Sequence, residues 1–422
     1  MASINIKKRG KAYQYSFEIA PQDGKRKWIT KSGFRTKAEA LEAGCNAQSE
    51  YLNAGVPFKE CKMSYGDYLE YWLDNYCRVN LKYNTVQKYQ VLIRKYIKPK
   101  LGKYRLSTIT SVSLNAFITE VCEQYDFSRS YFKNILKVLK GTFRDACNLY
   151  GFLKYNPALT LRLPKIDKVK TNVKHLYTQE EIDIILNRFR YDDTFTCAFL
   201  TSRFTGMRTG EAFALTWEDI DLKNRIIYIR HNVYSKPKDE KGRWYIGEPK
   251  TFSGKRQIYI SDTLLIALSN YKKKQDYLKK LYGYKYKYYH LEDVLNEYGK
   301  VVEQRIVENT DKDEPIIDLV FTKNDGKYVG TNLTRYPYKI IHEELGIKNC
   351  RFYDLRGSYA TKILKNGVEI RDVADLLGHR DVETTENYYI SSTETSKMEA
   401  TNVFDEVTHS EIINKIIQYD VY

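Results

Sequence analysis

The chain lacks the long apolar runs that cross membranes. No stretch of about 18 apolar residues occurs in its 422 residues, which excludes a spanning helix. Its start, from Met1 to Arg9, also lacks the apolar core of a signal peptide. We therefore expect a protein that stays in the cytoplasm of a host cell and has no membrane partner.

Cysteine is scarce and scattered. The chain has seven cysteines, none of them in a Cys-x-x-Cys pair, so neither a disulfide framework nor a zinc site is predicted. Most of the thiols are expected to be buried as small hydrophobic groups. The six histidines are equally dispersed, and no metal or other cofactor is predicted.

Acidic residues are few in the first two fifths of the chain. The overall charge is +16, but residues 1–60 carry a net +5, residues 61–172 a net +12 and residues 173–422 a net −1. A basic part joined to a nearly neutral one is typical of nucleic-acid-binding modules attached to a further domain. A compositional bias toward lysine is the alternative, and it would spread the charge evenly.

Residues 1–60 predict a small sheet followed by a helix. Tyr13, Tyr15 and Phe17 alternate with polar residues as in a half-buried strand, and a second strand is expected at residues 25–30. A capping box at residues 36–39 opens a helix. The basic side chains of this region are candidates for DNA contacts: Lys7, Lys8, Arg9, Lys11, Lys25, Arg26 and Lys27. A solvated sheet edge guarded by lysines is the alternative.

Residues 61–165 predict a helical bundle, because apolar residues recur there at intervals of three and four. One helix carries the apolar face from Tyr65 to Tyr76. A second begins at Asn84 or Thr85, and Pro99 and Gly102 are expected to end it. Two more are expected at about residues 112–123 and 128–149. The polar faces carry a second set of candidate DNA-binding residues: Lys88, Arg94, Lys95, Lys133, Lys137, Lys140 and Arg144. The polar residues 166–174 are predicted to be a linker.

Residues 175–400 show mixed α and β patterns. A capping box at residues 178–181 opens a helical stretch to about Phe204, and strands are expected at residues 225–234, 242–248 and 256–260. Residues 276–312, rich in lysine and tyrosine, are predicted to be an insertion. Their tyrosines could stack on bases, but the pattern favours an amphipathic surface element. Residues 401–422 form a last segment with alternating apolar and polar character.

Four short segments of this last part are informative together. They are residues 205–211 with Arg208 and Glu211, residues 249–256 with Lys250, residues 353–356 with Tyr353 and Arg356, and residues 376–381 with His379; Tyr388 follows nine positions later. Each segment alone is a weak signal. Gly378, for example, is expected only to end a helix in the left-handed conformation.

This combination, in this order and spacing, resembles the tyrosine recombinase (phage integrase) family over about residues 175–395. The basic sheet and the bundle match the arm-binding and core-binding domains of integrases from phages and integrative conjugative elements. The resemblance implies a multi-domain α+β fold. Residues 1–60 would be a β-sheet and helix for arm-type sites, and residues 61–165 a helical core-binding domain. Residues 175–400 would be a mainly α catalytic domain with a small antiparallel sheet.

The resemblance also implies a site-specific recombinase that integrates or excises a mobile element. Arg208 and Arg356 would grip the scissile phosphate, and His379 would hydrogen-bond it. Lys250 would protonate the departing 5′-oxygen, and Tyr388 would be the nucleophile that forms a 3′-phosphotyrosine. Glu211 would support the site. Because the covalent link retains the energy of the phosphodiester, neither ATP nor metal is needed.

Two further tyrosines, Tyr353 and Tyr389, belong to or adjoin these motifs. The family usually has histidine where this chain has Tyr353, and a phenol with a pKa of about 10 is a poor base at neutral pH. We therefore expect Tyr353 to orient or support the site. Tyr389 competes with Tyr388 as nucleophile, but the nine-residue offset from His379 favours Tyr388, and neighbours on a helix point about 100° apart.

The implied partners are double-stranded DNA with core-type and arm-type sites, and three further copies of the chain in a homotetramer on two DNA sites. An excisionase and DNA-bending accessory proteins are also implied. Residues 401–422 would pack on a neighbouring protomer or on their own domain. Two other functions stay open: a type IB topoisomerase-like enzyme, and a non-catalytic DNA-binding regulator derived from a recombinase, for which Tyr353 is the hint.

Overall fold

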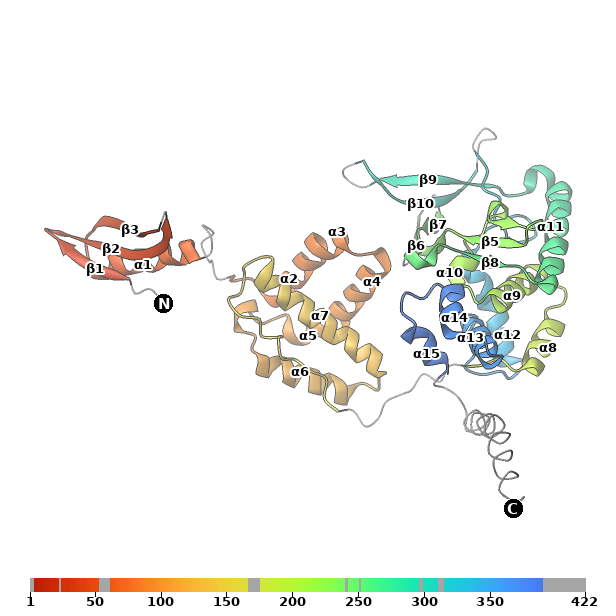
Figure 1. The fold of residues 1–422 in the computed structure, drawn as a ribbon, viewed down its shortest axis with the longest axis horizontal. Coiled ribbons are helices and arrows are strands. Elements are labelled where there is room, and N and C mark those ends of the chain that lie inside the picture. The colour runs from red at the N-terminus through yellow and green to blue at the C-terminus, as the bar shows by residue number, and fades with distance from the viewer. Residues whose placement is uncertain are drawn as a thin grey trace, which may run out of the picture. The chain divides into compact units, whose positions relative to one another are not determined.

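The computed structural model describes residues 4–22, 24–52, 61–165, 175–239, 242–249, 252–295, 299–309 and 315–389 (Figure 1). The chain divides into two compact units, Met1–Asn172 and Val173–Tyr422. The expected linker at residues 166–174 and the segment 401–422 lie outside the described residues and stay predictions. Every helix within the described ranges is too short or too polar to cross a bilayer.

The first unit begins with a three-stranded antiparallel sheet and one helix. Strands β1 (Asn5–Arg9), β2 (Ala12–Gln22) and β3 (Lys25–Phe34) lie in the order β1-β2-β3, and α1 (Lys37–Leu52) follows. Tyr15 and Phe17 of β2 are buried, and the ring centroid of Phe17 lies 6.1 Å from that of Tyr51 in α1, so the helix covers this face. The predicted strands and helix are confirmed. β1 is an addition, because its run of basic residues gives no apolar alternation.

A helical bundle follows in the first unit. Its helices are α2 (Tyr65–Trp72), α3 (Arg78–Asn80), α4 (Tyr83–Leu92), α5 (Lys98–Leu101), α6 (Ser111–Gln124) and α7 (Arg129–Asn148). The predicted apolar face of the first helix is buried, with Trp72 at 2% exposure. Nε1 of Trp72 donates a hydrogen bond to Oδ2 of Asp145 at 2.8 Å, which ties α2 to α7.

The second helix of the bundle runs past Pro99 and ends at Gly102, the other residue that was predicted to end it. α4 passes through a π-helical turn, Ile93–Ile97, into α5, and Pro99 occupies the first turn of α5. Proline is tolerated there because the preceding π-helical turn already interrupts the regular i to i−4 hydrogen bonding of the helix. Gly102 then ends the helix.

The second unit combines helices with two small antiparallel sheets (Figure 1). Its helices are α8 (Gln179–Arg188), α9 (Asp193–Thr205), α10 (Thr209–Ala212), α11 (Asp262–Tyr282), α12 (Arg335–Glu343), α13 (Asp354–Lys365), α14 (Ile370–Leu377) and α15 (Glu383–Tyr389). Its strands are β4 (Ile220–Asp221), β5 (Ile226–Ile229), β6 (Asn232–Asp239), β7 (Gly242–Gly247), β8 (Arg256–Tyr259), β9 (Tyr289–Leu295) and β10 (Val301–Glu308). One sheet has the order β6-β7-β10-β9 and the other β4-β5-β8. The expected α+β class is confirmed, with two sheets in place of one.

One expectation about these strands is wrong. The single strand expected at residues 225–234 is two strands, β5 and β6, which belong to different sheets. The strands before and after residue 250, β7 and β8, also pair in different sheets. Pairing depends on distant residues, such as Tyr245 of β7 opposite Arg305 of β10, and local alternation does not reveal it.

The segment predicted as an insertion, residues 276–312, begins inside α11 and continues into the β9–β10 hairpin. β10 pairs with β7 as well as with β9, so the hairpin extends the larger sheet. Tyr286 and Tyr289 are buried and are therefore not available to stack on bases, whereas Tyr284 is exposed. That the segment is an inserted surface element stays a prediction.

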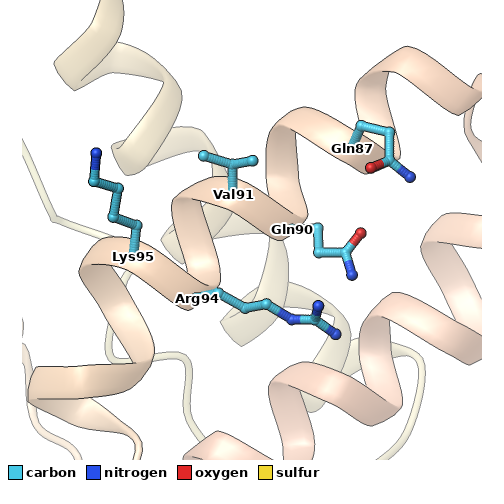
Figure 2. A pocket seen from close by; sticks show the side chains of 5 residues that line it. All are labelled: Gln87, Gln90, Val91, Arg94 and Lys95. Carbon is cyan, nitrogen blue, oxygen red and sulfur yellow. The ribbon is translucent and has the colours of Figure 1, made fainter. Parts of the chain in front are cut away.

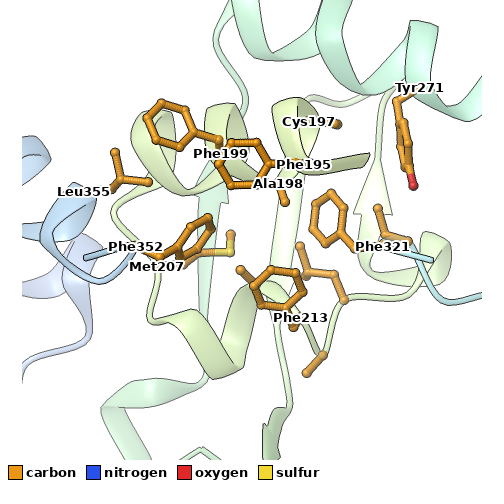
Figure 3. Close-up of a cluster of buried hydrophobic side chains, with 14 of the residues drawn as sticks. Phe195, Cys197, Ala198, Phe199, Met207, Phe213, Tyr271, Phe321, Phe352 and Leu355 are labelled. Atoms are coloured by element: carbon orange, nitrogen blue, oxygen red, sulfur yellow. The ribbon is translucent and has the colours of Figure 1, made fainter. Parts of the chain in front are cut away.

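An aromatic core fixes the backbone beside the expected site residues (Figure 3). The ring centroid of Phe213 lies 5.7 Å from that of Phe321 and 5.6 Å from that of Phe352. Met207 and Leu355 are buried in the same cluster, and each directly precedes an arginine of the site. The core therefore determines where Arg208 and Arg356 leave the backbone.

Gly206 packs closely against Tyr359 and Leu377, and its replacement gives a prediction. Gly206 ends α9 with a φ of 61°, and a Cβ there would lie 2.5 Å from Cδ1 of Tyr359. Gly367 has a φ of 83° but open space around it. We expect Gly367→Ala to lower the free energy of unfolding by about 1 kcal/mol through left-handed strain. Gly206→Ala should lower it by about 3 kcal/mol, because overpacking adds to that strain. Urea unfolding of the intact chain measures both, and equal losses would contradict the packing argument.

Candidate active site

Arg208 stands at the start of α10, where a carboxylate holds its guanidinium. Its Nη1 donates to Oε1 of Glu211 at 2.7 Å, and its backbone N–H donates to Oε2 of Glu211 at 2.9 Å. Its Nη2 donates to the carbonyl of Gly378 at 2.9 Å. Two of the four sequence motifs are therefore in direct contact. The Arg208 side chain is 25% exposed, so solvent still reaches it.

Arg356 lies in the first turn of α13 and is 1% exposed. Its Nη1 donates to the carbonyl of Gly206 at 2.8 Å, and its Nη2 donates to the carbonyl of Leu377 at 2.7 Å. Its buried Nε has no hydrogen-bond partner among the described residues. A buried donor without a partner is unfavourable, and an oxygen of a bound anion would satisfy it.

The end of α14 places His379. Gly378 has a φ of 66°, the left-handed conformation that the sequence predicted. The N–H of Gly378 donates to the carbonyl of Asp375, and the N–H of His379 donates to that of Ala374, which is the pattern of a Schellman motif. The buried ring of His379 has its Nδ1 2.7 Å from Oγ1 of Thr385 in α15.

Arg256 is a member of the site that the sequence analysis does not single out. It begins β8, its side chain is 7% exposed, and its Nη2 donates to Oε2 of Glu211 at 3.0 Å. Its Nε donates to the carbonyl of Leu376 at 2.7 Å. The available signal was strand parity: Arg256 shares a face with the buried Ile258 and Ile260, and a charge on a buried face needs a partner.

The cluster shifts the acidity of its members. Burial, together with the nearby charge of Arg208, lowers the pKa of Arg356 to about 10. Burial alone would raise the pKa of Glu211, but the charges of Arg256 and Arg208 outweigh it and hold this pKa below its ordinary value. At neutral pH Arg356 is still protonated and Glu211 is ionised. With three guanidiniums and one carboxylate, the site attracts an anion.

Tyr353 lies at the rim of the site. It directly precedes α13, its side chain is half-exposed, and it lies within electrostatic range of Arg356. Its expected orienting role stays a prediction.

Three other expected residues are not placed by their side chains. Lys250 lies outside the described residues. Tyr388 and Tyr389 are the last residues of α15, and only their backbone is described. The helix that bears both tyrosines is nevertheless tied to the site, because Thr385 of α15 contacts His379.

The basic residues predicted to bind DNA are all exposed. Figure 2 shows Arg94 and Lys95 at an open surface hollow along α4 and its π-helical extension. Gln87, Gln90 and Val91 complete the lining, so cationic and amide side chains occupy one face. Their contact with DNA stays a prediction. Within the described ranges, His, Cys, Asp and Glu side chains form no group of three that could hold a metal ion.

Comparisons with known proteins agree over most of the chain. Residues 176–395 match the phage integrase family, residues 64–121 match the N-terminal SAM-like domain of phage integrases, and residues 5–50 match an arm DNA-binding domain. A "Tyrosine recombinase XerC-like" protein of Caldanaerobacter subterraneus subsp. tengcongensis is 28% identical over 91% of this chain and 94% of its own length. The ICEBs1 integrase of Bacillus subtilis is 24% identical over 89% of this chain and 91% of its own length.

Solved structures share the fold. The Tn1549 transposon integrase, in complex with a circular intermediate DNA, aligns with a TM-score of 0.61 at 19% identity, covering 81% of this chain and 99% of that one. A lambda integrase from a tetramer bound to a Holliday junction aligns with a TM-score of 0.53 at 16% identity, covering 90% of this chain and 96% of that one.

The family match extends over more than half of the chain and includes Arg208, Arg356, His379 and Tyr388. These matches and the site together define a DNA strand-transferring enzyme of the tyrosine recombinase class. The chain belongs to the phage integrase family, the site-specific recombinases of mobile elements.

The shared carboxylate predicts a pH dependence of stability. The pKa of Glu211 is lowered in the folded chain from its ordinary value of 4.5, so its stabilising contribution is full above that value and is lost as the pH falls. We expect Glu211→Gln to lower the free energy of unfolding by about 3 kcal/mol at pH 7, because removal of one partner leaves buried charges unmatched. The difference from wild type should narrow as the pH falls below 4.5.

Urea unfolding at a series of pH values measures this difference. Glu344→Gln is the matched control, because its ion pair with Arg188 lies at the surface, and it should change stability by less than about 1 kcal/mol. A Glu211→Gln defect that does not vary with pH would contradict the electrostatic explanation.

Proposed function

We propose that this recombinase cuts and rejoins DNA through Tyr388, while Arg208, Arg356 and His379 hold the scissile phosphate. The observation that carries the proposal is the convergence of the two arginines on successive carbonyls at the end of α14, directly before His379. Two planar guanidiniums held in this way offer paired donors to one phosphate. The unpartnered Nε of Arg356 is a further donor.

In the proposed reaction the hydroxyl oxygen of Tyr388 attacks the phosphorus, and the phenol proton passes to solvent. The bond from phosphorus to the 5′-oxygen breaks, and Lys250 gives a proton to that oxygen. The 5′-hydroxyl of the strand cleaved at the other DNA site then attacks the 3′-phosphotyrosine. Its proton passes to the departing phenolate, and Tyr388 is released. One phosphate ester replaces another at each step, so the scheme needs neither ATP nor a metal ion. The arginines stabilise the negative charge on the non-bridging oxygens of the phosphate in the transition state, and loss of one such donor typically slows a reaction by about 10²–10³.

Two residues support this chemistry without reacting. Glu211 orients Arg208 through two hydrogen bonds. We infer that Tyr353 orients the phosphate from the rim of the site, since its half-exposed ring precedes the helix that bears Arg356.

We infer that the chain works as a homotetramer on two DNA sites in the cytoplasm of a bacterial host. The lambda integrase tetramer bound to a Holliday junction and the bacterial and phage relatives support this inference. The bundle would bind core-type sites and the N-terminal sheet arm-type sites. An excisionase and DNA-bending proteins are proposed accessory partners. The segment 401–422 would pack on a neighbouring copy or on its own domain.

The N-terminal sheet has one open face, which is the proposed surface for arm-type DNA. Helix α1 covers the face of Tyr15 and Phe17, and Lys8 lies on that side, with its amine 5.9 Å from the ring centroid of Tyr13. Lys7 pairs with Gln14 on the opposite face. By the same alternation Arg9, Arg26 and Trp28 lie on the open face.

The two faces give a prediction for DNA binding. Lys7→Ala should weaken binding to arm-site DNA and reduce the slope of log affinity against log salt by about 1, because one phosphate contact is lost. Lys8→Ala is the matched control and should change the slope far less. Fluorescence anisotropy between about 50 and 200 mM salt measures both slopes. A larger effect of Lys8→Ala would place the DNA on the other face.

The nucleophile gives a second prediction. In excess EDTA, the protein should form a covalent adduct with a nicked suicide duplex that spans the junction of the parent element's ends. Tyr388→Phe should abolish the adduct, and Tyr389→Phe should leave it within about tenfold of wild type, since only the reacting hydroxyl is essential. Peptide mapping locates the linkage.

Other outcomes would change the proposal. An adduct on Tyr389 would move the nucleophile by one residue. Salt-sensitive binding without any adduct would favour the regulator function, and relaxation of supercoils without a two-site product would favour a topoisomerase-like enzyme.

A further inference from the structure

Arg256 contributes three hydrogen bonds to the site without any role in the proposed chemistry. Its Nη2 bonds Glu211, its Nε bonds the carbonyl of Leu376 at 2.7 Å, and its Nη1 bonds the carbonyl of Gly254 at 3.1 Å. The side chain is 7% exposed, so DNA is not expected to reach it. A residue so placed acts on the reaction only through its neighbours.

The first neighbour is the end of α14. Successive carbonyls at residues 376, 377 and 378 accept hydrogen bonds from Arg256, Arg356 and Arg208 in turn. The last carbonyls of a helix have no partner within it and form the negative end of its dipole, so each suits a guanidinium. Arg256 holds the first of the three, and His379 follows the last directly. Loss of Arg256 would leave one carbonyl unpaired and loosen the turn that carries His379.

The second neighbour is Glu211, which Arg208 and Arg256 share. One carboxylate oxygen accepts from Arg208 at 2.7 Å and the other accepts from Arg256 at 3.0 Å. The Glu211 side chain is 1% exposed, so water does not replace either partner. With Arg256 present, the charge of Glu211 is divided between two cations. Without it, Glu211 would neutralise Arg208 alone, and Arg208 would attract a phosphate less strongly.

We propose that Arg256 is a positioning residue for the scissile phosphate. Through Glu211 it keeps Arg208 oriented and its positive charge available, and through the carbonyl of Leu376 it holds the turn that carries His379. This proposal rests on the proposed function of Arg208. A purely structural arginine would stabilise the fold equally whatever substrate is bound. If Arg256 positions a cationic site, its replacement should slow cleavage more when the phosphate is charged than when it is neutral.

The test compares two substrates in single-turnover strand cleavage by the intact protein. One nicked duplex has the normal phosphodiester, and the other has a methylphosphonate at the scissile position, in which a methyl group replaces one non-bridging oxygen and removes the ground-state charge. Arg256→Met should slow cleavage of the phosphodiester by about 10²-fold, as loss of one stabilising donor does. On the methylphosphonate the cleavage rate of the same variant should fall by less than about tenfold, because this substrate has no ground-state negative charge for Arg208 to neutralise.

Matched variants complete the design. Arg208→Ala should show the same dependence on substrate charge, and Arg256→Lys should be intermediate, because lysine keeps the charge but cannot bond three acceptors. Arg188→Met removes a surface arginine paired with Glu344 and should change neither rate by more than about threefold. Affinity for DNA should stay within about threefold of wild type in Arg256→Met.

Equal losses on both substrates, or no loss, would overturn the proposal. If Arg256→Met fails to fold, as its thermal melt would show, Arg256→Lys decides the question by the same comparison. A wild-type protein that cleaves neither duplex would contradict the proposed function itself, whereas a wild-type protein that cleaves both and an Arg256→Met protein that matches it would contradict this inference alone.

Discussion

The site depends on how one short helix, α14, ends. Its last carbonyls would be unpaired in isolation, and three guanidiniums from separate parts of the chain meet them: Arg208 before α10, Arg256 at the start of β8 and Arg356 in α13. Like charges repel, but each of these has a fixed acceptor within 2.9 Å, and Glu211 lies between two of them. A phosphate would therefore bind to hydrogen-bond donors that are already oriented, so the side chains need little reorganisation when charge develops in the transition state.

Two glycines make this convergence possible. Gly206 and Gly378 both adopt left-handed backbone conformations, and their carbonyls accept from Arg356 and Arg208. At Gly378 the backbone of the neighbouring segment is so close that a Cβ would lie 2.7 Å from the carbonyl oxygen of Ser253. The segment that leads into β8 thus closes over the end of α14. The end of α14 is therefore constrained both by close packing and by the hydrogen bonds of three arginines.

The site residues lie in four separate sequence motifs, and most of these residues could be predicted. The resemblance to the tyrosine recombinase family indicated Arg208, Glu211, Arg356 and His379, and the structure brings these four residues to the end of α14. Periodicity and caps located most helices because these signals lie within a few residues of one another. The strand pairings could not be found in this way, since Tyr245 and its partner Arg305 are far apart along the chain. Arg256 was missed for the same reason: its partners, Glu211 and Leu376, are distant from it along the chain.

Exposure divides the cations of this chain into two kinds. The lysines and arginines that are predicted to bind DNA in the N-terminal sheet and the bundle are exposed, and salt screens such charges strongly. Arg256 and Arg356 are buried at the site, where screening is much weaker, and Arg208 is intermediate. Exposed charges therefore suit attraction and release of long DNA, while buried ones suit stabilisation of a single phosphate. The two tasks make opposite demands on solvent, and a chain that kept all its positive charge at the surface would bind DNA without a preorganised place to cut it.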